Sequence, residues 1–183
     1  NRKRVFEKPK IEYVLRSLYS LIKSIKKLKS ENKDIEIKLK IVDDNSNEEN
    51  LKKLKNLLIL SSLDFEIIGH MFNDHKNYIK EQKSSETFAN LSSLLKSFEI
   101  GKTEGKDLVF FVEDDYLHFE SALEEMIATY ERIASQLNKE IFMCPSDYPY
   151  LYMNNEKTSL LLGSKRHWRS INKTLCTFLA PTS

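Results

Sequence analysis

Apolar residues recur at every third or fourth position in several stretches of the chain, with polar residues between them. Such spacing gives a helix one apolar stripe and predicts amphipathic helices. Three helices are expected, at residues 13–28, 85–100 and 119–137. A fourth is expected over 47–60, because Ser46 and Glu49 have the spacing of a capping box at a helix start.

Short apolar runs bounded by polar turn residues separate these helices and predict strands. The run over 35–42 alternates apolar and polar positions, as a strand with one buried face does. Further strands are expected at 65–68, 108–112, 141–144, 160–163 and 174–179. Loops are expected at 70–83 and at 145–155, where several Tyr and Pro residues give the composition of a binding loop. The alternation of helices and strands predicts a three-layer α/β fold with a largely parallel sheet.

Composition bounds the class of protein. The chain has 183 residues, of which 40% are hydrophobic and 31% charged, and this balance is typical of one soluble globular domain over 1–183. No apolar run has the length of a membrane span, and no signal-peptide pattern opens the sequence, so we expect a cytoplasmic protein. Cys144 and Cys176 are too few for a disulfide framework and are expected to be reduced, buried thiols.

The net charge is only +2, but its distribution is uneven. Residues 2–55 are rich in Lys, whereas acidic residues gather over 113–125. A basic face can attract nucleic acid or an anionic membrane. The Lys residues lack the interleaved aromatic residues of a nucleic-acid platform, so no nucleic-acid partner is expected. A solvated helix surface is favoured, while a peripheral contact with the inner face of a membrane and the oligomeric state stay open.

Two acidic clusters carry the most chemical information. Asp43–Asp44 closes one predicted strand, and Glu113–Asp115 closes another. Ligands of open α/β sheets bind outside the carboxyl ends of the strands, so two parallel strands would bring both clusters to one crevice. Crowded carboxylates repel one another unless a cation offsets their charge. The pattern predicts a metal-dependent site for a phosphorylated or sugar-bearing ligand, with a solvated turn and a helix-start charge cluster as the simpler alternatives.

Other ligand motifs are missing from the sequence. With four glycines in the chain, neither a dinucleotide fingerprint nor a Walker phosphate loop can be placed. This argues against a dehydrogenase or a P-loop enzyme.

The acidic segments resemble motifs of one enzyme family. Ile41–Ser46 resembles the second-strand signature of family 2 glycosyltransferases with the GT-A fold, and Phe111–Asp115 resembles their DXD metal motif with Glu at its first position. Ala89–Asn90 resembles the segment before the DXD strand, and Asn1–Arg2 resembles the end of an opening motif of the TYNR type. The resemblance covers roughly 1–120 in the right order. It departs from the family at Phe88 and Ala89, where a basic residue is usual.

The resemblance implies a GT-A fold that uses a nucleotide-diphospho-sugar donor and Mn²⁺ or Mg²⁺. Asp43, Asp44, Asn90 and Asp114 would contact the nucleotide, while Asp115 would ligate the metal with help from Glu113. Residues 1–120 would form the donor half, and 121–183 would begin the acceptor half. The similarity also implies that the sequence is truncated at both ends.

The acceptor side is less defined. Asp147 is the candidate catalytic base, and the other expectation is a base beyond Ser183. Trp168, His167 and Tyr148 are candidate acceptor-binding residues, with packing roles for the aromatic rings as the alternative. We therefore expect a hexosyltransferase that acts on a glycan or a lipid-linked acceptor in polysaccharide or glycolipid synthesis. The alternatives are a nucleotidyltransferase and a non-catalytic GT-A-like binding domain.

Overall fold

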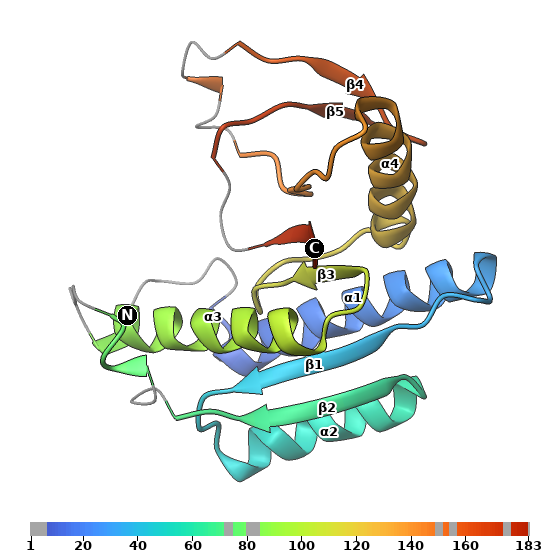
Figure 1. Cartoon of the computed structure of the whole chain (residues 1–183). Coiled ribbons are helices and arrows are strands. Elements are labelled where there is room, and N and C mark those ends of the chain that lie inside the picture. Colours follow the sequence, from blue (N-terminus) through green and yellow to red (C-terminus); the bar gives the residue numbers. More distant parts are fainter. Residues whose placement is uncertain are drawn as a thin grey trace. The chain divides into compact units, whose positions relative to one another are not determined.

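The computed structural model describes residues 7–71, 75–79, 85–148, 152–153, 157–173 and 177–182. These residues form a mixed α/β protein with four helices and short strands (Figure 1). The chain divides into two compact units, which are described separately below. The first unit comprises 1–19 and 34–105, and the second comprises 20–33 and 106–183. Helix α1 (Lys10–Glu31) gives its first half to the first unit and its second half to the second.

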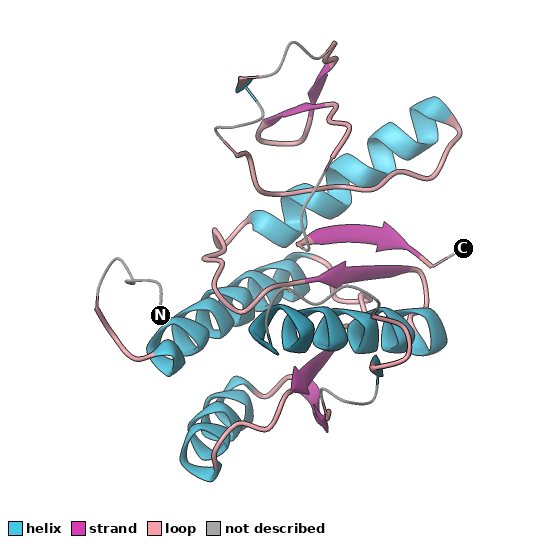
Figure 2. Ribbon diagram, turned by 90° about the vertical axis from the view of Figure 1, so that its left-hand side faces the viewer, coloured by secondary structure: helices cyan, strands magenta, loops and turns pink. Residues whose placement is uncertain are grey.

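The first unit is built on a parallel strand pair. Strands β1 (Lys38–Asp43) and β2 (Asp64–Gly69) pair residue by residue over their whole length and are joined by helix α2 (Glu48–Ser61). Helix α3 (Ser85–Glu104) follows β2 and contacts β1. In the two ribbon views, α2 and α3 lie on different sides of the strand pair (Figures 1 and 2). This β–α–β arrangement matches the sequence prediction for residues 38–69.

Local sequence explains the bounds of α2. Asn47 is the N-cap, since its side chain accepts a 2.8 Å hydrogen bond from the amide of Asn50. The predicted capping box at Ser46 is therefore wrong by one residue. Ser62 ends the helix with a left-handed backbone (φ 58°), and Leu54 and Leu58 are buried on the inner face.

The second unit is built on antiparallel pairing. Strand β3 (Leu108–Phe111) pairs with β6 (Phe178–Pro181), and Met143 forms an isolated bridge to Leu179. The second half of α1 packs against the start of α4 (Ala122–Leu137) and the connection before it. The hydroxyl groups of Ser20 and Ser24 accept hydrogen bonds of 2.9 and 3.0 Å from the backbone amides of His118 and Leu123. Its apolar stripe is buried as predicted, at Leu21, Ile22, Ile25 and Leu28.

A small hairpin completes the described part of the second unit. Strands β4 (Leu160–Leu162) and β5 (His167–Arg169) pair antiparallel across a short turn. Strand β5 thus lies between the two strands expected at 160–163 and 174–179. The expected strand at 141–144 is reduced to the bridge at Met143, and that at 174–179 is observed as Phe178–Pro181, while 174–176 lie outside the described residues.

Of the three strand pairs among the described residues, one is parallel and two are antiparallel. The prediction of an α/β protein is confirmed, but the predicted largely parallel sheet is not found in these pairs. Parallel pairing requires a crossover such as α2, whereas β5 follows β4 through a short turn that reverses the chain. In the described residues, no helix combines the length and the apolar character needed to cross a bilayer. Cys144 is a half-buried free thiol, and Cys176 lies outside the described residues.

Candidate functional site

Asp43 and Asp44 lie at the carboxyl edge of the parallel pair in the first unit. Asp43 is the last residue of β1 and is paired with Gly69, the last residue of β2. The amide of His70 donates a 2.8 Å hydrogen bond to the carbonyl of Asp43 and so extends the pairing past both strand ends. The segments that follow β1 and β2 therefore both begin at the edge of the strand pair where ligands of α/β proteins bind.

The two carboxylates at this edge differ in their bonding. Asp43 Oδ2 accepts a 3.1 Å hydrogen bond from the amide of Ser46 and stabilises the turn that leads to α2. Asn45, within that turn, has a left-handed backbone (φ 55°). The half-buried carboxylate of Asp44 has no hydrogen bond or ion pair to any residue in the described part of the chain. Asp43 thus takes the turn role, and Asp44 is the carboxylate left for a ligand.

Helix α3 carries the third predicted nucleotide-binding residue. Asn90 is exposed, whereas Phe88, at one of the places where the family resemblance expects a basic residue, is buried in the core. The departure from the family pattern therefore serves packing.

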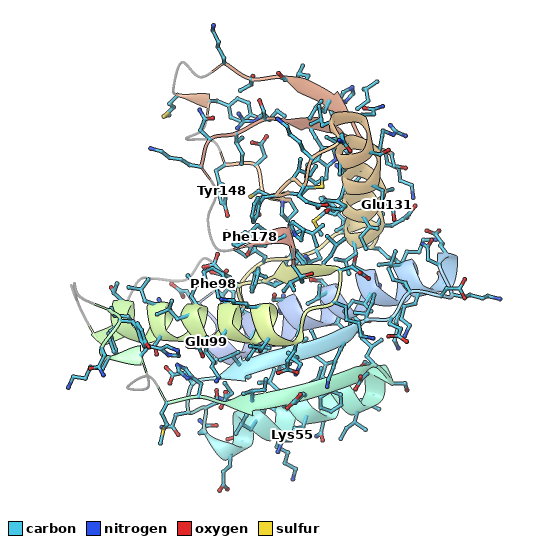
Figure 3. All side chains as sticks on the ribbon, viewed as in Figure 1. Lys55, Phe98, Glu99, Glu131, Tyr148 and Phe178 are labelled. Carbon is cyan, nitrogen blue, oxygen red and sulfur yellow. The ribbon has the colours of Figure 1, made fainter. Side chains whose placement is uncertain are left out.

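Glu113, Asp114 and Asp115 follow β3 in the second unit. The amide of Glu113 donates a 3.1 Å hydrogen bond to Oγ1 of Thr177, a buried residue just before β6. Asp114 and Asp115 form an exposed turn. Phe178 of β6 (Figure 3) contacts Phe111 of β3, the strand that leads into this turn, and the two tilted rings have their centroids 5.1 Å apart.

The acidic turn changes the acid–base properties of Glu113. Burial raises the pKa of the Glu113 carboxyl, and the charges of Asp115 and Asp114 raise it further, against the opposing effect of hydrogen bonds with Tyr116 and Thr177. The Tyr116 hydroxyl is hydrogen-bonded to that of Tyr148, and burial raises the pKa of Tyr116. Asp114 and Asp115 are exposed and their charges act on Glu113, so a cation bound at this turn would reduce the repulsion among the three carboxyl groups.

The donor set suits a hard divalent ion shared with a ligand. Among the described residues, no group of three Asp, Glu, His or Cys side chains is arranged to hold a metal ion. Mg²⁺ is often bound through one or two protein carboxylates together with substrate phosphate oxygens. Asp115, which is exposed, and Glu113 beside it are the residues that would take that partial role for Mn²⁺ or Mg²⁺. Asp44 and this turn belong to different units, so the expected common crevice stays a prediction.

Asp147, the candidate base, is held by two partners. Arg169 donates to Oδ1 of Asp147 at 3.0 Å, and the hydroxyl of Tyr152 donates to its other oxygen. The Arg169 guanidinium also lies 4.4 Å from the centre of the Tyr152 ring. Partial burial acts to raise the pKa of Asp147, but the hydrogen bonds from Tyr152 and Arg169 outweigh it and leave the pKa lowered. A carboxylate with a lowered pKa is a weaker base.

The predicted acceptor residues lie in two different settings of the second unit. Trp168 is half-buried in β5, and its indole N–H donates a 3.0 Å hydrogen bond to buried Glu125. His167 is exposed beside it, at the β5 position paired with Leu162. Tyr148 instead contacts Tyr116 near the acidic turn. The Trp168 N–H is therefore engaged in the structure, which leaves its ring face for any acceptor.

Sequence reasoning missed the residues that support these side chains. Glu125 carries a buried carboxylate, and Gly163 provides the space beside it. A signal for Glu125 was present, since it shares an i, i+4, i+8 stripe with buried Thr129 and Ile133 on α4. Nothing in the local sequence marks Thr177 as the partner of Glu113, because they are 64 residues apart.

Comparisons with known proteins add no relative. No protein-family model, curated protein or solved structure matches this chain significantly.

Proposed function

We propose that this protein is a divalent-metal-dependent glycosyltransferase of the GT-A type. It transfers a sugar from a nucleotide-diphospho-sugar to an acceptor hydroxyl, in the synthesis of a polysaccharide or glycolipid in the cytoplasm. The observation that carries the proposal is the Asp44 carboxylate at the carboxyl edge of the parallel β1–β2 pair, with no partner in the described residues. An acidic side chain at this edge can accept hydrogen bonds from the base or ribose of a nucleotide.

The acidic turn after β3 supplies the second part of the proposal. Asp115, with Glu113 beside it, ligates Mn²⁺ or Mg²⁺ together with the donor diphosphate, while Asp114 and Asn90 contact the nucleotide. The bound metal supplies Lewis-acid stabilisation of the negative charge on the leaving diphosphate. Burial is the main cause of the raised pKa of Glu113, and the charges of Asp115 and Asp114 raise it further. This second contribution supports the role, because a cation would offset the repulsion among the three carboxyl groups.

One observation favours the alternative of a non-catalytic binding domain. Asp147 is paired with Arg169, and its pKa is lowered, so this residue is poorly suited to deprotonate an acceptor hydroxyl. Metal-dependent hydrolysis of UDP-sugar or GDP-sugar donors separates the two functions. An enzyme releases sugar slowly in water, whereas a binding domain retains the donor intact.

The proposed nucleotide contact of Asp44, at the carboxyl edge of the β1–β2 pair, is tested with a matched pair of variants. Asp44→Asn removes the charge at the carboxyl edge, and Asp64→Asn makes the same change at the exposed first residue of β2, at the opposite end of the strands. Loss of a hydrogen bond to a charged group corresponds to a roughly ten- to hundred-fold loss of affinity for UDP or GDP. We expect this loss in Asp44→Asn alone. Equal affinities in the two variants would contradict the assignment of Asp44.

The proposed metal site at the acidic turn after β3 is tested in the same way. Asp115→Asn should abolish the Mn²⁺-dependent part of nucleoside-diphosphate binding. Asp107→Asn, at the exposed residue before β3, should leave it unchanged. Binding that depends on Mn²⁺ equally in both variants would remove Asp115 from the metal site.

A further inference from the structure

The last turn of helix α2 carries two large apolar side chains at the surface of the first unit. Ile59 is 64% exposed and Leu60 is 79% exposed, whereas Leu54 and Leu58 of the same helix are buried. Single exposed apolar residues are common on protein surfaces, but contiguous apolar patches mark contact sites. The surface beside Ile59 and Leu60 therefore decides whether they belong to such a site.

An open groove between α1 and α2 continues this apolar surface. It has a volume of about 480 Å³ and is lined mostly by apolar atoms. Leu15 and Tyr19 of α1 line it together with Leu57 and Leu60 of α2. All four residues belong to the first unit, and Tyr19 is 53% exposed. These four residues and the neighbouring Ile59 are called the α1–α2 patch below.

Three basic side chains border the patch and are called its basic border. Lys52 and Lys55 are exposed on α2, and their spacing from Ile59 brings all three residues to one side of the helix. Arg16 lines the groove from α1, and Lys55 projects from α2 in Figure 3. Within the described part of the chain, none of the three basic side chains forms a hydrogen bond or an ion pair. The basic border is therefore available to an anionic partner.

Acidic residues of the two helices do not cancel this charge. Glu48 and Glu49 lie in the first turn of α2, at the end of the helix opposite Ile59, and Glu49 is paired with Lys53 at 2.6 Å. The groove itself is lined by one acidic residue, Glu12, and by two basic residues, Arg16 and Lys53. The apolar end of α2 is thus next to a net positive surface.

An anionic phospholipid bilayer matches both properties of this surface. Apolar side chains on a surface helix gain free energy by entering the interface of a bilayer, and nearby Lys and Arg residues are attracted to its anionic headgroups. A second copy of this chain matches less well. In a two-fold symmetric contact the patch would meet itself, and the two basic borders would then repel each other.

We propose that the α1–α2 patch and its basic border dock this protein on an anionic phospholipid membrane. Ile59 and Leu60 enter the interface between headgroups and acyl chains, and the basic border binds the headgroup phosphates. This docking does not depend on the proposed transferase activity. If that activity is correct, the same surface brings the enzyme to a lipid-linked acceptor.

The first test is co-sedimentation of the intact chain with vesicles, without nucleotide or metal. Vesicles of phosphatidylcholine alone are compared with vesicles that contain about one third phosphatidylglycerol. We expect binding to the anionic vesicles to be at least about ten-fold tighter and to weaken in high salt, because salt screens the attraction. Absence of binding to the anionic vesicles, or equal binding to both kinds, would overturn the proposal.

The basic border is tested with two double variants of equal charge. Lys52→Gln with Lys55→Gln should weaken binding to the anionic vesicles about twenty-fold, because each Lys near such a surface contributes about five-fold. Lys96→Gln with Lys102→Gln removes the same charge from α3, on a different side of the strand pair, and should have a much smaller effect. Equal losses in the two double variants would show attraction by net charge alone and would overturn the assigned surface.

The apolar contact is tested in the same vesicle assay. Ile59→Ser with Leu60→Ser should weaken binding roughly ten-fold or more, since two apolar side chains lose their transfer from water. Leu160→Ser with Leu162→Ser, at exposed positions of β4 in the second unit, should bind like wild type. Binding unchanged in the α2 variant would overturn the patch. A concentration-dependent dimer that this variant abolishes, without vesicle binding by the wild type, would assign the patch to a second copy instead.

Discussion

The indole N–H of Trp168 donates a 3.0 Å hydrogen bond to Oε1 of Glu125, a carboxylate that is only 3% exposed. The same carboxylate accepts from the Thr129 hydroxyl at 3.2 Å and from the amides of Lys165 and Arg166 at 2.6 and 3.2 Å. Burial of a charge without hydrogen-bond partners is energetically unfavourable, and these four donors offset that free-energy cost. Glu125 therefore fixes the β4–β5 hairpin to α4.

Removal of the indole donor should destabilise the second unit. Trp168→Phe keeps a ring in β5 but leaves Glu125 with one donor fewer, which costs about 1.5–3 kcal/mol for a bond to a charged group. Tyr130→Phe, which removes an exposed hydroxyl bonded to Glu140, is the control and should cost less. Thermal and urea unfolding measure both variants. Equal losses of unfolding free energy would mean that Glu125 does not depend on Trp168.

Gly163 should tolerate no side chain. A Cβ at this position would lie 2.2 Å from Glu125 Oε1, 2.6 Å from Trp168 Nε1 and 2.7 Å from Thr129 Oγ1. Overpacking of this kind costs about 1–3 kcal/mol. Gly163→Ala should lower the free energy of unfolding by that amount, whereas Gly69→Ala, where a Cβ meets nothing within 4 Å, should change it little. The account of the hairpin fails if both variants are equally stable.

Acid should loosen the second unit through Glu125. Burial alone would raise the pKa of Glu125, but hydrogen bonds from Trp168, Lys165, Thr129 and Arg166 outweigh it, and the pKa is lowered from its usual 4.5. A lowered pKa contributes stability above the unfolded-state value, and this contribution is lost as the pH falls through the lower folded-state value. We expect the wild type to lose more unfolding free energy below pH 4.5 than Glu125→Gln does. Urea titrations between pH 7 and 3 measure the difference, and parallel curves would contradict it.

Release of Asp147 from Arg169 should restore its basicity. Partial burial acts to raise the pKa of Asp147 and hydrogen bonds lower it, so Arg169→Gln should raise this pKa. Carboxyl ¹³C NMR follows the titration directly. If Asp147 is the base of a transferase, the acid limb of the pH–rate profile should shift to higher pH together with this pKa. A limb that stays in place while the NMR value moves would exclude Asp147 as the base.

Periodicity along the chain predicted most of the helices and the first two strands. The helical spacing over 13–28 marks residues of α1 that are buried, and the alternation before Asp43 marks β1. The position of Asp43 and Asp44 after a strand also followed from sequence, because strand ends and turn residues are local features. The parallel pairing of β1 with β2 fits the helix between them, since a crossover permits it.

The second unit was less predictable because its contacts are between distant residues. Three-residue strands such as β4 and β5 carry too few positions for a periodic signal, and exposed Leu160 and Leu162 look like core residues in sequence. The direction of β6 depends on its pairing with β3, about 70 residues earlier. The buried role of Glu125 depends on donors at residues 165–168, which no local pattern connects to α4.

The most direct test of the central claim is calorimetric titration of the wild-type chain with UDP and with GDP, each with Mn²⁺ and with EDTA. The proposed donor site predicts saturable binding of one nucleotide that requires the metal, because Asp115 and the diphosphate share the cation. Absence of binding for both nucleotides in the presence of Mn²⁺ would contradict the assignment of this protein as a nucleotide-sugar transferase.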